Sequence, residues 1–256
     1  MVNKTCTVTI EYVSLGGDKG KYTGPVVNGK PEGIGTVVYD NGITYKGSFK
    51  EGLYNGSGNI AWPNGDTFEG VFKNGLENGH GINKYANGFY FEGEFIDGQR
   101  TGPGQYKTSK GDVYVGGFKD NKESGHGILT LRNGEVIECN FKEGWEDGHG
   151  TIKYPDGTIF EGEFVMGKKN GHGVERCADG SVFEGTFVNN RKNGYGIEKC
   201  SDGSIFEGEY KDGWRNGHGV VKYANGNVYE GEYKDGQRVG RGIIKYANGD
   251  VEEVDN

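Results

Sequence analysis

Long apolar runs are missing from this sequence of 256 residues. Hydrophobic residues make up only 32% of the chain, which is too few for a conventional thick core. No stretch approaches the roughly 18 apolar residues that a membrane span requires. A basic segment followed by an apolar run is also absent, so we expect no signal peptide. The 3.6-residue hydrophobic period of a helix occurs nowhere, which argues against helices.

Positive charge and cysteine are also scarce. The chain has 29 Lys and Arg against 37 Asp and Glu, a net charge of −8 that argues against nucleic acid as a partner. Strand spacing would set the cysteines of adjacent repeats about 10 Å apart, beyond the ~7 Å limit for a disulfide. Free thiols predict a cytoplasmic protein. The four cysteines are Cys6, Cys139, Cys177 and Cys200.

The chain instead consists of a 23-residue phrase that recurs ten times without a gap over residues 22–251. We number its positions 1 to 23 from an aromatic residue, as in residues 206–228. Of the 51 glycines, 47 fall at positions 3, 8, 12, 14 and 21, and this fixed register indicates fixed structure rather than a disordered linker. Residues 1–21 precede the repeats as a capping strand over Thr5–Val13 and a connector, and residues 252–256 form an acidic tail.

The phrase predicts a β-hairpin. Positions 1 and 5 are aromatic in nine copies each and share one strand face with the glycine at position 3. A second strand is expected over positions 12–18, with short loops at 7–11 and 19–22 that imply antiparallel pairing. Turn residues at positions 19–21 predict a three-residue loop, which sets Gly219 against Gly231. Asn121 and Asn190 replace glycine at position 8 and predict a left-handed backbone there. Rings should cover the glycines of positions 3 and 14.

The pattern Y/F-E-G-x-F/Y-x-x-G-x-x-x-G-x-G resembles the MORN repeat (membrane occupation and recognition nexus) over 230 of the 256 residues. The resemblance implies an all-β fold, an elongated single-layer twisted antiparallel β-sheet of tandem β-hairpin repeats. Departures from the pattern predict local irregularity between residues 100 and 140. They are Ile137 for the aromatic residue, Cys139 for a glycine, and Pro103 and Thr108 in the fourth copy.

No catalytic residue, metal ligand or cofactor site is predicted. Neighbouring histidines would lie about 10 Å apart, too far to share a zinc ion. The segment from Gly16 to Lys21 lacks the spacing of a phosphate-binding loop, and no nucleophile has a partnered histidine and acid. All five histidines occupy position 13: His80, His126, His149, His172 and His218. Three of them should face a glutamate across the turn: His80 and Glu94, His149 and Glu163, His218 and Glu232.

The leading functional hypothesis is a non-enzymatic scaffold or adaptor that binds protein partners in an aromatic groove. The resemblance implies a cytoskeletal, ciliary or membrane-associated assembly. The groove residues are Tyr210, Tyr223, Tyr229, Tyr233 and Tyr246. One alternative is a phosphoinositide-binding or anionic-membrane-binding module that uses basic loop tips of repeats 7–10. These tips carry Lys168, Lys169, Arg191, Lys192, Arg215 and Arg238. A regulatory subunit or fragment of a lipid-kinase-type enzyme and a homodimer are also left open.

Overall fold

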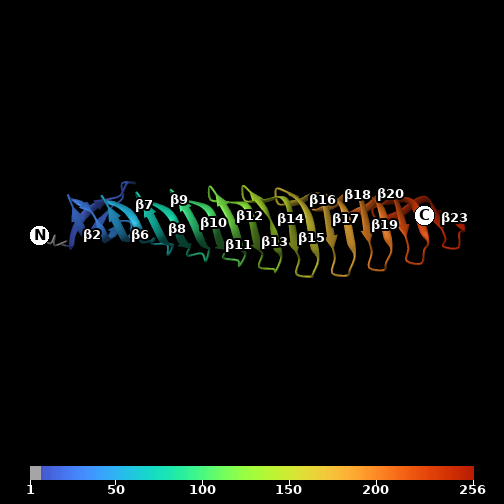
Figure 1. Cartoon of the computed structure of the whole chain (residues 1–256), viewed down its shortest axis with the longest axis horizontal. Helices are drawn as coiled ribbons and strands as arrows, with labels where there is room; N and C mark the ends of the chain where they lie inside the picture. The colour runs from blue at the N-terminus through green and yellow to red at the C-terminus, as the bar shows by residue number, and fades with distance from the viewer. Residues whose placement is uncertain (1–6) are drawn as a thin grey trace. The chain divides into compact units, whose positions relative to one another are not determined.

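A computed structural model of the protein describes residues 7–256. These residues fold into β-strands joined by tight turns, and they include no helix, hence none that could cross a membrane. The chain divides into two compact units, of which the first ends at Arg132 and the second begins at Asn133. In each unit, strands that are neighbours in the chain pair in antiparallel fashion (Figure 1). The prediction of an all-β fold of tandem antiparallel hairpins is therefore confirmed.

The first unit holds twelve strands. They are β1 Thr7–Val13, β2 Lys19–Val27, β3 Lys30–Pro31, β4 Gly33–Tyr39, β5 Thr44–Lys50, β6 Leu53–Ala61, β7 Thr67–Lys73, β8 Leu76–Lys84, β9 Tyr90–Ile96, β10 Gln99–Lys107, β11 Val113–Lys119 and β12 Lys122–Thr130. The second unit holds eleven strands. They are β13 Val136–Lys142, β14 Trp145–Lys153, β15 Ile159–Val165, β16 Lys168–Arg176, β17 Val182–Val188, β18 Arg191–Lys199, β19 Ile205–Lys211, β20 Trp214–Lys222, β21 Val228–Lys234, β22 Gln237–Lys245 and β23 Val251–Asp255.

The turn over positions 19–21 has the predicted three-residue form. Between β20 and β21, the Tyr223 N–H donates to the Asn227 carbonyl at 2.8 Å, and the Gly226 N–H donates to the Tyr223 carbonyl at 3.0 Å. Gly226 has a φ of 87°, a backbone conformation that glycine adopts without strain. The predicted pairing of Gly219 with Gly231 is confirmed.

The other turn is shorter than the loop predicted over positions 7–11. Positions 7 and 8 both have positive φ in every repeat, as at Asp212 (50°) and Gly213 (94°). Asn121 (68°) and Asn190 (71°) share this conformation, which confirms the left-handed prediction for position 8. Two consecutive residues with positive φ form the turn type that matches the twist of paired strands, so the strand resumes at position 9 rather than 12.

The longer second strand contains a bulge. In the β15–β16 hairpin, Gly162 pairs with Gly173 and Phe164 pairs with Lys169, so three residues of β16 lie opposite Glu163 alone. Gly171, at position 12, has a φ of 111° within this bulge. Bulges bend a strand. Position 10 pairs with position 5, as Lys169 does with Phe164, so its side chain lies on the same face as the rings of positions 1 and 5.

In each unit the core is a row of rings on one face of the sheet, which we call the aromatic face. The rings of positions 1 and 5 alternate edge to face, as in Phe160–Phe187 (5.0 Å, 80°) and Phe183–Phe187 (5.4 Å, 90°). The ring of Phe160 lies over Gly173, where an added Cβ would come within 2.5 Å of its Cε2 atom. This confirms that rings cover the glycines. The opposite face, with positions 2, 4, 13 and 15, is the charged face.

The departures from the repeat are absorbed without a change of register. The β10–β11 and β13–β14 hairpins pair as the others do, so the irregularity expected between residues 100 and 140 does not reach the register. Ile137 and Cys139 are buried on the aromatic face, and Cys139 lies opposite Gly150. The capping strand predicted over Thr5–Val13 is described from Thr7 onward, as β1, and its first two residues lie outside the described residues. The predicted acidic tail forms β23, which pairs with β22.

Candidate binding surfaces

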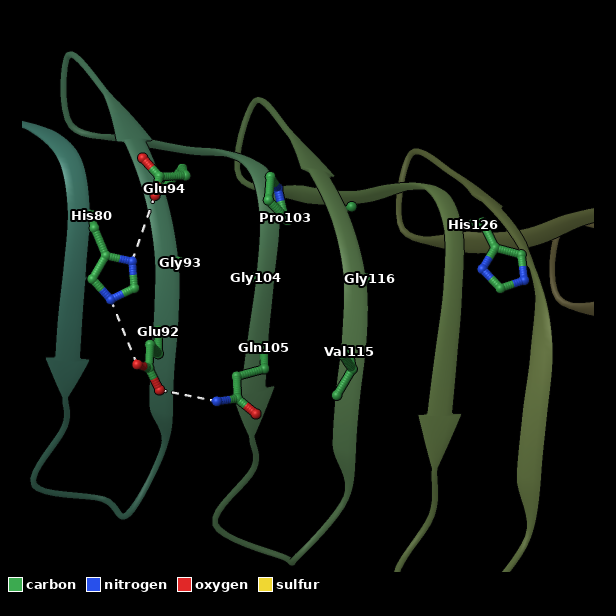
Figure 2. A pocket seen from close by; sticks show the side chains of 11 residues that line it. His80, Glu92, Gly93, Glu94, Pro103, Gly104, Gln105, Val115, Gly116 and His126 are labelled. Carbon is green, nitrogen blue, oxygen red and sulfur yellow. Dashed lines mark hydrogen bonds and ion pairs between the residues drawn. The ribbon is translucent and has the colours of Figure 1, made fainter.

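A hollow of about 690 Å³ opens on the charged face of the first unit, over β8 to β12. Figure 2 shows His80 and His126 at its two sides, with Pro103 and Val115 between them. The backbone of Gly93, Gly104 and Gly116 forms its floor.

The hollow lies where the charged cover seen between β8 and β9 is missing, at the junction of the fourth and fifth repeats between β10 and β11. Between β8 and β9, His80 lies against two carboxylates, with Nδ1 3.5 Å from Glu94 Oε1 and Nε2 3.5 Å from Glu92 Oε1. The residues that stand in the same places between β10 and β11 are all uncharged. They are Pro103, Gln105, Val115 and Gly117.

The predicted pairing of position 13 with position 4 across the turn is confirmed by the register. The pairs are His80 with Glu94, His149 with Glu163, and His218 with Glu232. His218 forms the same double contact as His80, with distances of 3.4 Å to Glu232 and 3.7 Å to Glu230. Among residues 7–256, no group of three or more His, Cys, Asp or Glu side chains is arranged to hold a metal ion.

The rim of the hollow is acidic. The Tyr90 hydroxyl donates a hydrogen bond to Glu92 Oε2 at 2.6 Å, and the Gln105 amide donates to the same oxygen at 2.9 Å. These two hydrogen bonds lower the pKa of Glu92, so its carboxylate stays ionised. The exposed side chain of Val115 and the ring of Pro103 supply apolar wall. The hollow can therefore accept a chain segment that presents a cation beside small apolar groups.

The aromatic face is closed rather than grooved at most of the tyrosines predicted to meet a partner. Tyr210, Tyr229 and Tyr233 are 4%, 0% and 5% exposed, so they are core residues. Tyr223 and Tyr246 are half-buried, so part of each side chain is exposed to solvent. The Tyr223 hydroxyl accepts a hydrogen bond from Arg238, and the Tyr246 hydroxyl donates one to Glu252.

The basic residues predicted at loop tips do not form a common row. Because the turn has only two residues, they belong to strands, and strand alternation sends positions 9 and 10 to opposite faces. Lys168 and Arg191, at position 9, are exposed. The four at position 10 lie over the ring of position 1 instead. The distances from cation to ring centroid are 4.3 Å for Lys169 over Phe160, 4.3 Å for Lys192 over Phe183, 4.2 Å for Arg215 over Phe206 and 3.7 Å for Arg238 over Tyr229.

Two of these cations share a carboxylate that sequence reasoning missed. Arg215 Nη2 lies 2.7 Å from Glu198 Oε2, and Lys192 Nζ lies 2.9 Å from Glu198 Oε1. The Tyr210 hydroxyl also donates to Glu198 Oε2, at 3.0 Å. Burial alone raises the pKa of Glu198, but the hydrogen bonds from Arg215 and Lys192 outweigh it and hold the pKa at about 2. Lys169 is paired in the same way with Glu175 at 2.7 Å. The available signal was a glutamate at position 16, where most repeats carry an apolar side chain.

Among the described cysteines, Cys139 is the one that burial makes unreactive. Cys139, Cys177 and Cys200 are free. Burial, with the nearby Glu146 carboxylate, raises the pKa of Cys139 to about 12, which keeps the thiol protonated and unreactive.

Tandem hairpins that carry, in each unit, a ring row on one face and charged side chains on the other define a tandem β-hairpin repeat protein. The family model of the MORN repeat matches ten successive segments of the chain, which therefore belongs to the MORN repeat family. The matched segments are residues 22–44, 45–67, 68–89, 91–113, 114–136, 140–159, 160–182, 183–205, 206–228 and 229–251. Residues 137–139, where Ile137 and Cys139 depart from the pattern, fall between two matches.

Comparison with curated protein sequences gives no match. Among solved structures, the chain is similar to the TCP10 domain of Danio rerio CPAP, solved with a peptide of Danio rerio STIL, at 15% identity and a TM-score of 0.44. That match covers 97% of this chain and 100% of the other. The Drosophila melanogaster SAS-4 TCP domain, solved with a proline-rich motif of Ana2, matches at 14% identity and a TM-score of 0.39, covering 60% of this chain and 85% of the other. Likeness at this level establishes no shared site or partner.

Proposed function

We propose that this MORN-repeat protein is a non-enzymatic scaffold that binds a protein partner in the hollow on its charged face. The observation that carries the proposal is the gap in the charged cover between β10 and β11. There the His and Glu side chains that cover the neighbouring glycines give way to Pro103 and Val115. The volume lies within the roughly 300–1,000 Å³ of typical ligand sites.

The partner that fits is an extended segment with a lysine or arginine beside small apolar residues. Its cation would meet Glu92 and Glu94, whose carboxylates face the hollow. Its apolar residues would cover Val115 and Pro103, and its backbone could approach the glycine floor closely because no Cβ intervenes. The proposed setting is a cytoskeletal, ciliary or membrane-associated assembly in the cytoplasm, as the family resemblance implies and as the free thiols favour.

Binding to phosphoinositides is the less favoured function. Four of the six basic residues on which it depends cover aromatic rings, and Lys169 is buried. Lys168 and Arg191 remain for an anionic surface, and Arg191 lies 3.8 Å from the Asp212 carboxylate. No contact in the described residues favours a regulatory fragment of an enzyme over an independent scaffold.

The test is affinity capture by three forms of the chain, followed by identification of retained proteins. Val115→Arg places a cation in the acidic hollow, whereas Val188→Arg makes the same change at an exposed valine outside it. We expect a protein that is retained by the wild type and by Val188→Arg and lost with Val115→Arg. Retention by all three forms would contradict the hollow as the site.

A vesicle experiment tests the alternative function. Co-sedimentation with phosphoinositide vesicles that is salt-sensitive and lost in a Lys168→Ser, Arg191→Ser variant would favour the lipid-binding function instead.

A further inference from the structure

The outer edge of β1 carries an unusual combination of features for an exposed strand. Among the described residues, β1 pairs only with β2, so one of its edges has no strand beside it. The strand reads TVTIEYV, with one charge, no proline and no lysine. Natural edge strands are usually protected by such residues. β23 in the second unit illustrates this protection, because Glu252, Glu253 and Asp255 give it three negative charges in five residues.

The hydrogen-bonding phase of β1 follows from its contacts with β2. The Ser14 N–H donates to the Asp18 carbonyl at 2.9 Å, and antiparallel pairs alternate between bonded and non-bonded. Val8, Ile10 and Tyr12 are therefore bonded to β2.

Three observations agree with this hydrogen-bonding phase. Thr7 faces Pro25, which has no N–H. The hydroxyls of Thr9 and Thr23 lie 3.1 Å apart, as suits a non-bonded pair. The Lys19 carbonyl, opposite Val13, accepts from Asp40 on the far side of β2.

The N–H and C=O groups of Thr7, Thr9, Glu11 and Val13 consequently point out of the sheet edge. We propose that this edge binds the same edge of a second copy of the chain, as an antiparallel β1–β1 pair about a twofold axis at Ile10. In this register the bonded pairs are Thr7 with Val13 and Thr9 with Glu11 of the other copy. Each residue with outward groups then meets another such residue, which gives about eight backbone hydrogen bonds.

The side chains are self-complementary in the same register. Val8, which is exposed, lies opposite Tyr12 of the other copy, and Ile10 lies opposite Ile10, so the aromatic face continues across the junction. Glu11 lies opposite Thr9, which avoids a like-charge pair. If the twofold axis lay at Glu11 instead of Ile10, the Glu11 carboxylates of the two copies would lie opposite each other, which is unfavourable. Within the described residues, a register centred on Thr9 would pair only residues 7–11.

The first test uses a substitution that affects the outer edge alone. Thr9→Pro removes an outward N–H and leaves the bonds of β1 to β2 intact, because proline is tolerated where the strand N–H faces away from the sheet. Thr9→Val is the matched control, since it removes the hydroxyl and keeps the N–H. By light scattering with size exclusion, we expect the wild type and Thr9→Val at about twice the chain mass of 27.8 kDa. Thr9→Pro should weaken the dimer about tenfold or more.

The second test reads the register directly. In a background with the four native cysteines replaced by alanine, Ile10→Cys should form a disulfide-linked dimer on mild oxidation. Val8→Cys should not, because Val8 of the two copies would lie about 14 Å apart along the strands. A monomeric wild type, a dimer unaffected by Thr9→Pro, or equal cross-linking at residues 8 and 10 would each overturn the proposal.

Discussion

Repeats 2 and 8 solve the same packing problem with different chemistry. In repeat 2, the ring of Tyr54 stacks on Tyr45 with centroids 3.6 Å apart and planes at 9°, and its hydroxyl contacts that of Tyr39. In repeat 8, Lys192 occupies the corresponding place, with its ammonium 4.3 Å above the Phe183 ring. Both side chains stand at position 10 and cover the ring of position 1.

This comparison shows that the fold requires a side chain at position 10 to cover the ring of position 1, whether that side chain is neutral or charged. A tyrosine cover is neutral, and the adjacent position 16 holds apolar Ile60 in repeat 2. A lysine cover brings a charge into a partly buried place, and position 16 then holds a carboxylate, Glu175 in repeat 7 and Glu198 in repeat 8. The basic residues of the later repeats are thus explained by core packing before any ligand is considered.

Loss of the glycine trough should have the largest effect, and it should be equal in both repeats. An added Cβ at Gly58 would lie 2.5 Å from Cε2 of Tyr45, and at Gly196 it would lie 2.5 Å from Cε2 of Phe183. We expect Gly58→Val and Gly196→Val each to destabilise the protein by about 3 kcal/mol or more, because the rings are buried and cannot move aside.

The control for the trough is Gly16→Val, in the β1–β2 turn, where an added Cβ meets nothing closer than 3.7 Å. Thermal unfolding of the three variants measures the difference. Equal shifts in Tm for all three would show that the rings do not depend on the glycines.

The ion pair of Lys169 with Glu175 can be broken by one substitution, and the lysine cover can be replaced with a tyrosine cover by two. Glu175→Gln leaves the buried ammonium of Lys169 without its partner, so we expect a loss of about 2–3 kcal/mol. The double variant Lys169→Tyr, Glu175→Ile copies the Tyr54 and Ile60 pair of repeat 2 and should recover most of this loss. Urea unfolding of both variants provides the measurement. A double variant less stable than the single one would mean that the two covers are not interchangeable.

The charged cover should also make stability depend on pH. The pKa of Glu198 is about 2 in the folded chain against an ordinary value of 4.5. Folding is therefore stabilised by this group above pH 4.5, and the contribution is lost as the pH falls from 4.5 towards 2. With partial solvent exposure taken into account, we expect about 2 kcal/mol. Unfolding of the wild type and Glu198→Gln between pH 2 and 6 should converge at the acid end, and parallel curves would contradict the assignment.

The repeat made most of the fold predictable, because glycine and asparagine report backbone conformation directly. Gly226 fixed one turn and Asn190 revealed the left-handed residue of the other. The bulge at Gly171 escaped prediction, since positive φ is not visible when every copy carries glycine. The loop over positions 7–11 is shorter than the sequence predicts, so Lys169, which the sequence places at a loop tip, belongs to β16 and covers the ring of Phe160. The hollow was not predicted from the sequence either. Pro103 and Val115 contribute to it by leaving the glycine backbone uncovered, which a repeat pattern does not indicate.

The smallest effect separates two tyrosines that the sequence treats as equivalent. Tyr210 and Tyr233 both stand at position 5, but only Tyr210 has an acceptor, Glu198, because Val221 takes the place of that glutamate one repeat later. Within the described residues the buried Tyr233 hydroxyl has no hydrogen-bond partner. We expect Tyr210→Phe to cost about 1 kcal/mol and Tyr233→Phe to be neutral or slightly stabilising, because the latter removes an unsatisfied buried group. Denaturant midpoints of the two variants decide the matter, and equal losses would mean that Tyr233 finds an acceptor in solution.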